Sequence, residues 1–339
     1  MLSPSDNGNA GSHLISLRRQ LALITSFFDS SRRCIYIDYP VHTNIGDQLI
    51  NLGTEQFFAD HNLYVWRRYN YYDFPKEIPG IRRDDVLFFH GGGNFGDLWF
   101  NNQRFREAIL DRYPFNRVIF LPQTVHFKDS ARAAASIRRM AAHKNLHVFA
   151  RDHVSLDVLT KGGLKCVSAM PDMAQALAGV LEPSHEGEAG AALQLVRRDL
   201  ESFDAPPGLI HSDCPSIDWD HGTFSGVRQM FFHTIANTVK VVGRYGPPVD
   251  LHRLWYWHRD NMVADGVRWF SRYKTVATNR LHAMLLGIFL GRNVVAWDNN
   301  YGKLSAYYDS WLRDIPNLVF HRTASSEMGA ARVQSVGAD

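Results

Sequence analysis

The segment Arg280-Leu281-His282 carries the residue types best suited to chemistry in this chain of 339 residues. A short β-like run, 274–277, precedes it, and apolar residues at helical spacing follow it. A guanidinium and an imidazole in the first turn of a helix lie beside free backbone N–H groups and the positive end of the helix dipole. The segment therefore predicts an anion site with a titratable group. The alternative is a solvated Arg280 and a structural, buried His282.

Polar or glycine-containing segments follow four other predicted strands, 34–39, 86–90, 117–121 and 146–150. The candidate residues at these strand ends are Asn44, Asp47, Gly92, Gly93, Asn94, Gln123, Thr124, His126 and Arg151. Because the carboxyl ends of parallel strands meet at one edge of a sheet, these residues predict one wall of a ligand crevice. The alternatives are that Asn44 and Asp47 only cap a helix, and that Arg151 forms a weak local ion pair.

The segment Gly91–Gly96 matches the pattern G-x-G-x-x-G between a predicted strand and a helix, which is the fingerprint of dinucleotide binding. It follows the third predicted strand rather than the first, and the next strand ends in Pro122-Gln123-Thr124, without an acidic residue for a ribose. We therefore exclude a dinucleotide site. Glycines let a backbone approach a ligand closely, so we expect a loop that lines a cleft.

Composition describes an ordinary globular protein, with 45% hydrophobic and 21% charged residues. A net charge of +3 without a block of lysine and arginine argues against a nucleic-acid binder. The 3 cysteines are scattered, so neither a disulfide framework nor a zinc cluster is expected, and a reducing cytoplasm is the predicted compartment. No apolar run reaches membrane-spanning length.

The chain is predicted to form two α/β units. Residues 1–30 read as a tail followed by an amphipathic helix over 12–28, expected to pack on the core, with contact to a membrane surface as the alternative. Residues 31–182 repeat strand, polar loop and helix, as a doubly wound parallel sheet does. A polar linker at 182–190 leads to a second series, 191–322, and residues 323–339 read as a disordered tail. The predicted fold is two Rossmann-like domains that face a cleft.

The second wall of that cleft is predicted from the later half of the chain. Its polar candidates are Arg197, Arg280, His282, Asn300 and Lys303. Arginine forks bind carboxylate and phosphate oxygens in pairs, and a histidine among them suits proton transfer near neutral pH. The chain contains no HExxH, P-loop or G-x-S-x-G pattern, so no metal site or serine nucleophile is expected.

The ordered set of motifs resembles the polysaccharide pyruvyl transferase family. The resemblance covers about residues 35–312, and each motif alone has little specificity. The matching segments are Asn44-Ile45-Gly46-Asp47, Gly91-Gly92-Gly93-Asn94, Pro122-Gln123-Thr124, Phe149-Ala150-Arg151-Asp152, Pro171-Asp172 and Thr278-Asn279-Arg280-Leu281-His282. Residues 200–265 match only loosely, which leaves the acceptor open.

The resemblance implies a fold like that of the GT-B glycosyltransferases and transfer of pyruvate from phosphoenolpyruvate to a sugar hydroxyl pair, as a cyclic ketal. It implies donor contacts from Arg151, Arg280 and Leu281, and acid/base work by His282. Asn44, Gly92, Gly93 and Asn94 would complete the donor site. Phosphoenolpyruvate is a co-substrate, and no cofactor is implied. The implied acceptor is a lipid-linked oligosaccharide or polysaccharide, met at the inner face of the plasma membrane.

Two other functions fit the same pattern. The first is a GT-B glycosyltransferase with a nucleotide-sugar donor, for which Asp298 is the only plausible late carboxylate. The second is a non-catalytic module that senses a phosphorylated metabolite. Binding of phosphoenolpyruvate against nucleotide sugars, and release of phosphate with an acceptor, would distinguish the three.

Overall fold

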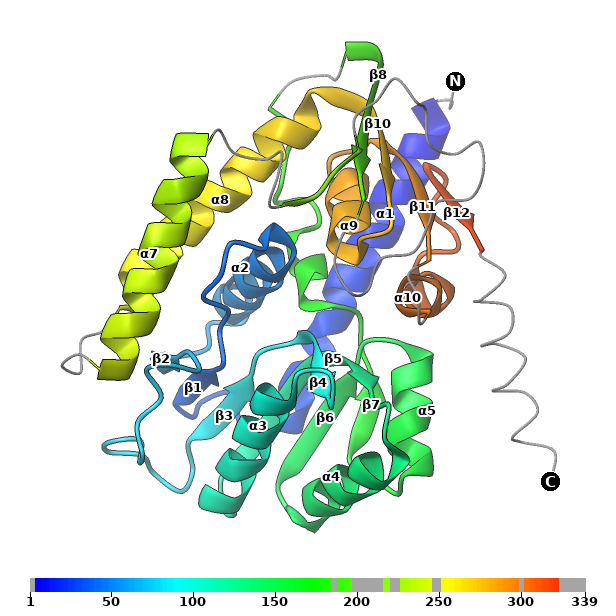
Figure 1. The fold of residues 1–339 in the computed structure, drawn as a ribbon. Helices are drawn as coiled ribbons and strands as arrows, with labels where there is room; N and C mark the ends of the chain where they lie inside the picture. The colour runs from blue at the N-terminus through cyan, green and yellow to red at the C-terminus, as the bar shows by residue number, and fades with distance from the viewer. Residues whose placement is uncertain are drawn as a thin grey trace.

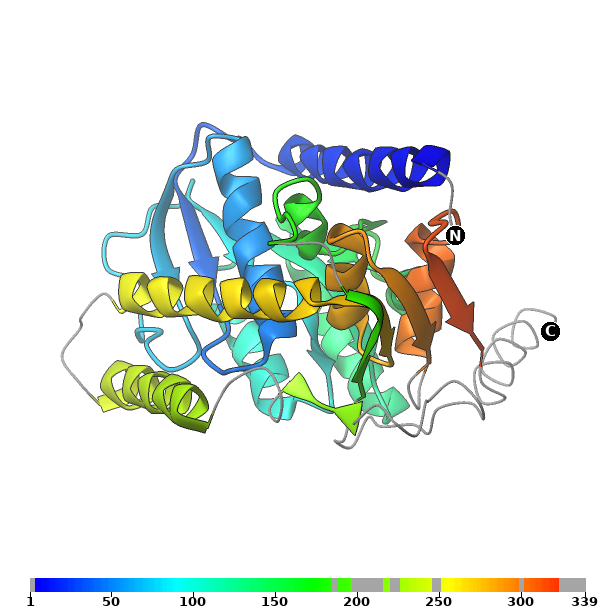
Figure 2. The same cartoon turned by 90° about the horizontal axis from the view of Figure 1, so that it is seen from above.

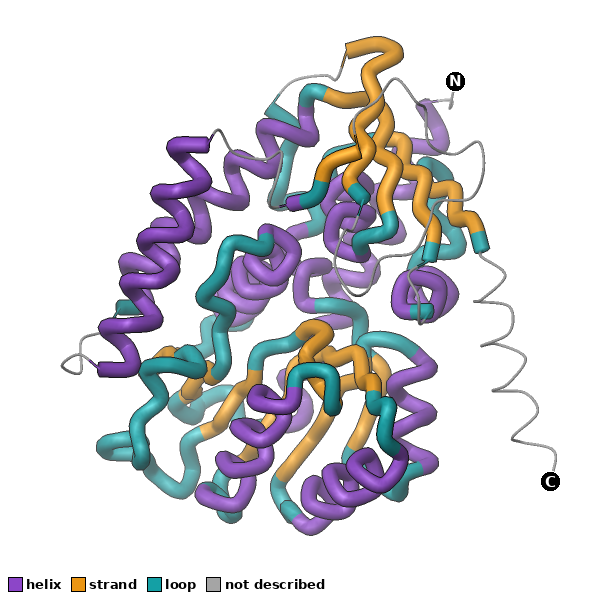
Figure 3. The backbone as a smooth tube through the Cα atoms, in the orientation of Figure 1, coloured by secondary structure: helices purple, strands orange, loops and turns teal. Residues whose placement is uncertain are grey.

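The computed structural model describes residues 4–184, 188–196, 216–219, 226–245, 251–298 and 302–322. Two parallel sheets with helices around them form the molecule, which confirms the predicted mixed α/β class (Figures 1 and 3). The predicted site residues Arg197 and Asn300, part of the predicted linker and the tail 323–339 lie outside the described residues.

The larger sheet has seven strands, in the order β2-β1-β3-β5-β6-β7, and β4 also pairs with β5. Its strands are β1 (Cys34–Ile37), β2 (Val65–Tyr69), β3 (Val86–Phe89), β4 (Gly92–Gly96), β5 (Arg117–His126), β6 (Leu146–Ala150) and β7 (Val167–Ala169). All of its pairs are parallel. The strand order reverses between β1 and β3, and ligands of open α/β sheets bind at the carboxyl ends of strands beside such a reversal.

The smaller sheet has five described strands, all parallel, in the order β12-β11-β10-β8-β9. They are β8 (Glu188–Leu195), β9 (Ser216–Ile217), β10 (Tyr273–Thr278), β11 (Asn293–Trp297) and β12 (Leu318–His321). Helices α9 (Leu281–Phe289) and α10 (Lys303–Trp311) follow β10 and β11. The functional segment 280–282 therefore stands at the carboxyl end of β10, as predicted.

Helices cover both faces of the larger sheet, because alternate residues of each strand are apolar and buried on opposite sides. One face packs on α3 (Phe100–Arg112), α4 (Ser130–Ala142) and α5 (His153–Lys161). The other face packs on α2 (Ile45–Asp60), while α8 (His252–Ser271) packs against α2, and α7 (Gly226–Tyr245) against α8. The amino end of α2 and the short helix η2 (Met173–Leu177) also enter the core of the smaller sheet, so the two sheets share a packed centre (Figure 1).

The amino-terminal helix packs on both halves of the molecule. Helix α1 (Pro4–Gln20) begins earlier than the predicted residue 12 and continues as a 3₁₀ helix, η1 (Leu21–Phe27). Leu14 and Leu17 are buried in the core of the smaller sheet, and Leu21 and Ile24 in that of the larger sheet. Figure 2 shows α1 running along one side of the molecule. The predicted packing role is confirmed, since the apolar residues are used inside the protein. Among the described residues, no helix is long and apolar enough to cross a membrane.

Three predicted loops are strands or merge into longer elements. The glycine run after β3 forms β4, because β5 offers it a parallel partner, with Gly96 beside His126. Strand β5 continues through Gln123 and Thr124, which were predicted to follow a strand. Strand β8 begins at Glu188, inside the predicted linker. These errors share a cause, since glycine and polar residues disfavour strands locally and only a neighbouring strand overrides that preference.

Candidate active site

A pocket of about 840 Å³ lies where the loops of the two sheets meet. The larger sheet contributes the ends of β1 and β3 and the first turn of α2, and the smaller sheet contributes residues 280–282 and the start of α10. Segments far apart in sequence therefore converge on one cavity. This volume is typical of a small-molecule site and exceeds the needs of a three-carbon ligand.

The reversal of strand order between β1 and β3 positions one wall of this pocket. Chain leaving β1 enters α2 through Asn44, whose Oδ1 accepts a hydrogen bond from the Gly46 N–H at 2.9 Å and whose Nδ2 donates to Asp47 at 3.1 Å. Asn44 is thus the predicted cap and also lines the pocket. Burial would raise the pKa of Asp47, but His42, His282, His90 and Lys303 together lower it. The first turn of α2 therefore presents a carboxylate.

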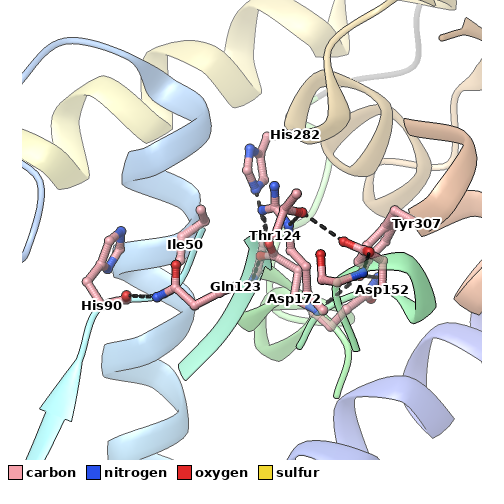
Figure 4. Close-up of polar contacts among 12 residues, drawn as sticks. Ile50, His90, Gln123, Thr124, Asp152, Asp172, His282 and Tyr307 are labelled. Atoms are coloured by element: carbon pink, nitrogen blue, oxygen red, sulfur yellow. Dashed lines mark hydrogen bonds and ion pairs between the residues drawn. The ribbon is translucent and has the colours of Figure 1, made fainter. Parts of the chain in front are cut away.

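His282 belongs to a buried triad with Asp172 and Arg151 (Figure 4). Its Nε2 lies 3.4 Å from Asp172 Oδ2, and the same oxygen accepts a hydrogen bond from Arg151 Nη1 at 2.7 Å. His282 lines the pocket with 12% of its side chain exposed, whereas Arg151 and Asp172 are fully buried. The triad therefore joins the pocket surface to a charge pair inside the protein.

Asp172 is held as a carboxylate. Its burial would raise the pKa, but the nearby His282 and Arg151 and the Ala174 N–H outweigh burial and lower it well below the usual range. Asp172 can thus orient the His282 ring, as a carboxylate does in hydrolase triads. Asp172 follows β7 directly, so its strand-end position was the signal that could have identified it; it was absent from the predicted site.

Arg151 and Lys303 meet over Gly93. Thr124 Oγ1 accepts a hydrogen bond from Arg151 Nε at 2.6 Å, which fixes the guanidinium plane. Among the described residues, no acceptor lies within hydrogen-bonding distance of Arg151 Nη2, although that atom is buried. A Cβ at Gly93 would overlap Lys303 Nζ and lie 3.2 Å from Arg151 Nη2. The missing side chain of Gly93 therefore leaves room for two cations from different halves of the chain.

Arg280 lines the pocket, but its fork faces a carboxylate of the protein. Its Nη2 lies 2.7 Å from Asp218 Oδ2 and its Nε 2.5 Å from Asp218 Oδ1. Both residues are largely buried, and a buried guanidinium needs such a partner. The predicted first-turn position is also one residue off, because Arg280 is the N-cap of α9. Asp218, from the loosely matching middle of the chain, was not predicted.

Two further titratable residues in the pocket were not predicted. His90, at the end of β3, lies with its Nδ1 2.5 Å from the Tyr36 hydroxyl, and burial lowers its pKa to about 3. Asp38, at the end of β1, has a φ of 68°, which non-glycine residues rarely adopt. Burial raises the pKa of Asp38 to about 6, although Arg106, Asn102 and Asn94 oppose this. His90 is therefore neutral at pH 7, and Asp38 titrates closer to neutrality than an ordinary aspartate.

The structure places most of the predicted site residues at the pocket, either in its lining or directly behind it. The pocket is lined by Asn44, Asp47, Gly93, Asn94, Arg280, Leu281, His282 and Lys303. Gln123 and Thr124 lie behind it, where Gln123 donates to the His90 carbonyl and Thr124 holds Arg151. Gly92, with a φ of 111°, continues the chain into Gly93. His126 lies at the far end of β5 beside Gly96 and is not part of the lining.

Comparison with known proteins identifies the family of this chain. The model of the family described as polysaccharide pyruvyl transferase matches residues 44–301. "Putative pyruvyl transferase EpsO" of Bacillus subtilis is 32% identical and covers 94% of this chain and 98% of its own. "Pyruvyl transferase 1" of Schizosaccharomyces pombe is 24% identical, over 84% of this chain and 71% of its own. A Klebsiella pneumoniae protein of uncharacterised function shares the fold, with a TM-score of 0.61 at 20% identity over 91% of this chain and 98% of its own.

The parallel α/β fold carries a carboxylate-oriented histidine at its cavity, with Lys303 in the lining and Arg151 buried behind it. The chain belongs to the polysaccharide pyruvyl transferase family, because the family match spans most of its length. It is a transferase enzyme of polysaccharide synthesis, and its family supports pyruvate transfer to a polysaccharide.

Proposed function

We propose that this enzyme transfers the pyruvyl group of phosphoenolpyruvate to two hydroxyls of one sugar and releases phosphate. The methylene carbon of the donor gains a proton, so that C2 becomes electrophilic. One hydroxyl forms a bond to C2, the C2–O bond to phosphate breaks, and the second hydroxyl closes the cyclic ketal. The two hydroxyls lose two protons in all. One is equivalent to the proton gained by the methylene carbon, and the other leaves on the phosphate.

The observation that carries this proposal is the triad of His282, Asp172 and Arg151 with Lys303 beside it. His282 is the only member that lines the cavity as a proton carrier, and Asp172 orients it. It would move a proton between a hydroxyl and the donor, which is a typical task for a positioned imidazole. Arg151 and Lys303 would hold the carboxylate and phosphate, so that charge is neutralised as it shifts to the leaving group.

The remaining donor contacts come from the same surface. Asn44, Leu281 and Asn94 line the cavity around His282, and the bare backbone at Gly93 would admit the ligand, while Gly92 stays a proposed donor residue. Arg280 is paired with Asp218, so we expect it to act on the donor through its electrostatic potential rather than through a direct bidentate contact. Asp47 lies beside His42 on the acceptor side. Arg197 and Asn300 stay proposals for that side.

We infer a GT-B-like division into halves at 31–182 and 191–322, with the donor between them. The acceptor proposed for this site is a lipid-linked oligosaccharide or polysaccharide precursor, met at the cytoplasmic face of the plasma membrane without a spanning segment. No cofactor is needed for the bonds described, so turnover should survive dialysis against EDTA.

The nucleotide-sugar alternative would need a carboxylate for a ribose. Asp298 is fully buried, and its Oδ1 accepts hydrogen bonds from the N–H groups of Leu304 and Ser305, which fits a cap of α10 better. We expect phosphoenolpyruvate, and not UDP- or GDP-sugars, to raise the melting temperature of the purified protein. A larger shift with a nucleotide sugar would overturn the proposed donor, and binding without phosphate release when acceptors are present would indicate a sensor.

Replacing Gly93 with alanine should raise the KM for phosphoenolpyruvate by roughly ten- to hundredfold. The added methyl group would displace the Lys303 ammonium and crowd Arg151 Nη2, so charge-assisted contacts to the donor are lost. Folding should be little affected, because the displaced group is the end of a flexible side chain. Steady-state kinetics of phosphate release measure the change.

Gly11→Ala is the matched control, since nothing lies within 4 Å of a Cβ at that position of α1. Its KM should equal that of the wild type. An unchanged KM for Gly93→Ala would mean that the donor does not lie over Gly93.

A further inference from the structure

A second hollow of about 440 Å³ opens beside the active-site pocket. The two cavities share Tyr71, Tyr72 and Asn101, so they form one continuous surface. The hollow is lined by the segment that follows β2, by helix α3 and by Arg244 near the end of α7. None of the predicted site residues lines it, and the proposed reaction makes no use of it.

Four cations surround this hollow, namely Lys76, Arg104, Arg112 and Arg244. No carboxylate is among its described lining residues. The chain as a whole is nearly balanced, with 37 basic and 34 acidic residues, so a lining of one sign is a local feature. Of the acids nearest in sequence, Asp73 accepts from the Asn70 side chain and Asp111 accepts from Arg139, and the exposed Glu77, next to Lys76, is not part of the lining. The hollow is therefore a positive concavity.

Its position along the sheet relates it to the donor. Arg151 ends β6, and Asp38 ends β1, three strand positions away in the order β1-β3-β5-β6. Neighbouring strands lie about 4.8 Å apart, so these two ends are separated by roughly 14 Å. One wall of the hollow is the segment after β2, the strand that lies beyond β1 in the same direction. A ligand that reaches from the donor to the hollow must therefore be longer than one sugar ring.

The wall between donor and hollow suits a sugar. Asp38 receives hydrogen bonds from Asn102 Nδ2 at 3.4 Å and 3.5 Å, and Asn94 is fixed by Arg106 Nη2 at 2.8 Å. A carboxylate and carboxamides can bind sugar hydroxyls. Tyr71 stands with 38% of its surface exposed at the junction of the two cavities.

We propose that the hollow binds a phosphate or diphosphate ester at the reducing end of the acceptor glycan, while the pyruvylated sugar occupies the wall beside Asp38. This assignment rests on the proposed function. Arginine forks match phosphate oxygens, and several cations suit a group with more than one negative charge better than a single sugar carboxylate. All four cations are solvent-exposed, so they are accessible to an acceptor that arrives from outside.

The test uses two acceptors that share one short glycan, one with a neutral alkyl aglycone and one with an alkyl diphosphate. Wild-type enzyme should show a KM about tenfold lower for the diphosphate, and rising salt should weaken the preference, because exposed charges are screened. The double variant Arg104→Gln, Arg112→Gln should reduce the ratio of the two KM values toward one. Arg138→Gln, an exposed arginine of α4 outside both cavities, is the matched control and should keep the wild-type ratio.

The outcomes separate this inference from the reaction itself. Ketal formation on both acceptors with equal KM values would overturn the phosphate site and leave the proposed reaction intact, whereas no transfer to either acceptor would count against the reaction. A preference for a uronate-bearing glycan over the diphosphate would also overturn the inference. A further comparison uses the same glycan on a polyprenyl diphosphate and on a short alkyl diphosphate. Equal KM values for these two acceptors would show that the enzyme recognises the phosphates and not the lipid chain. Lys76→Gln with Arg244→Gln repeats the test if the first variant melts early.

Discussion

Replacing His282 with alanine is expected to lower kcat by roughly 10²–10⁴-fold and to leave the melting temperature close to that of the wild type. The ring is the part of the triad that lines the cavity, so its loss removes the proton carrier. It is partly exposed and contacts Asp172 at only 3.4 Å, and the Arg151–Asp172 pair stays intact without it. Phosphate release under saturating donor and acceptor measures the effect.

His233, an exposed residue of α7, provides the control, and His233→Ala should retain wild-type kcat. Wild-type turnover in His282→Ala would exclude the proton role. A loss of melting temperature as large as that of a core variant would instead identify His282 as a structural residue, which was the alternative left open by its sequence.

The chemical segment at 280–282 could be identified from sequence because its signals are local. A strand, a short polar turn and an apolar helix follow one another, and these patterns depend on neighbouring residues. The strand 146–150 was predicted with its observed limits for the same reason, and Arg151 follows it. Positions at strand ends were therefore accessible from sequence.

The pairing of these residues with Asp172 and Asp218 was not accessible, because the partners lie far away in the chain. Asp172 is separated from His282 by 110 residues, and Asp218 from Arg280 by 62. An ion pair leaves no pattern in the sequence, and only the fold shows that a buried guanidinium has found its carboxylate. The sequence therefore did not show that the guanidinium of Arg280 faces Asp218.

Gly93 illustrates a further limit. Its run of glycines was interpreted as a ligand loop, whereas β4 is a strand. A glycine is nevertheless needed at position 93, because the side chain of Lys303, 210 positions later, occupies the space that a Cβ would fill. A glycine that admits a distant side chain cannot be distinguished by sequence from one that permits a turn.

Asp172→Asn is expected to have the largest combined effect on stability and activity. Arg151 is fully buried and would lose its counter-charge, at a cost of roughly 3–5 kcal/mol. His282 would lose the carboxylate that orients it, so kcat should also fall. Chemical unfolding and phosphate release measure the two effects. Asp157→Asn, which removes an exposed partner of Lys161, should change neither.

The pH dependence of that stability loss follows from the pKa of Asp172. Because His282 and Arg151 lower it in the folded protein despite burial, the stabilising contribution is present above the unfolded value of about 4 and is lost as pH falls below it. The difference in unfolding free energy between wild type and Asp172→Asn should therefore be present at pH 7 and shrink below pH 4.

Removing both charges, in the double variant Arg151→Met, Asp172→Leu, should recover the stability lost in Asp172→Asn but not the turnover. A single variant Asp172→Asn as stable and as active as wild type would mean that neither the arginine nor the histidine depends on this carboxylate.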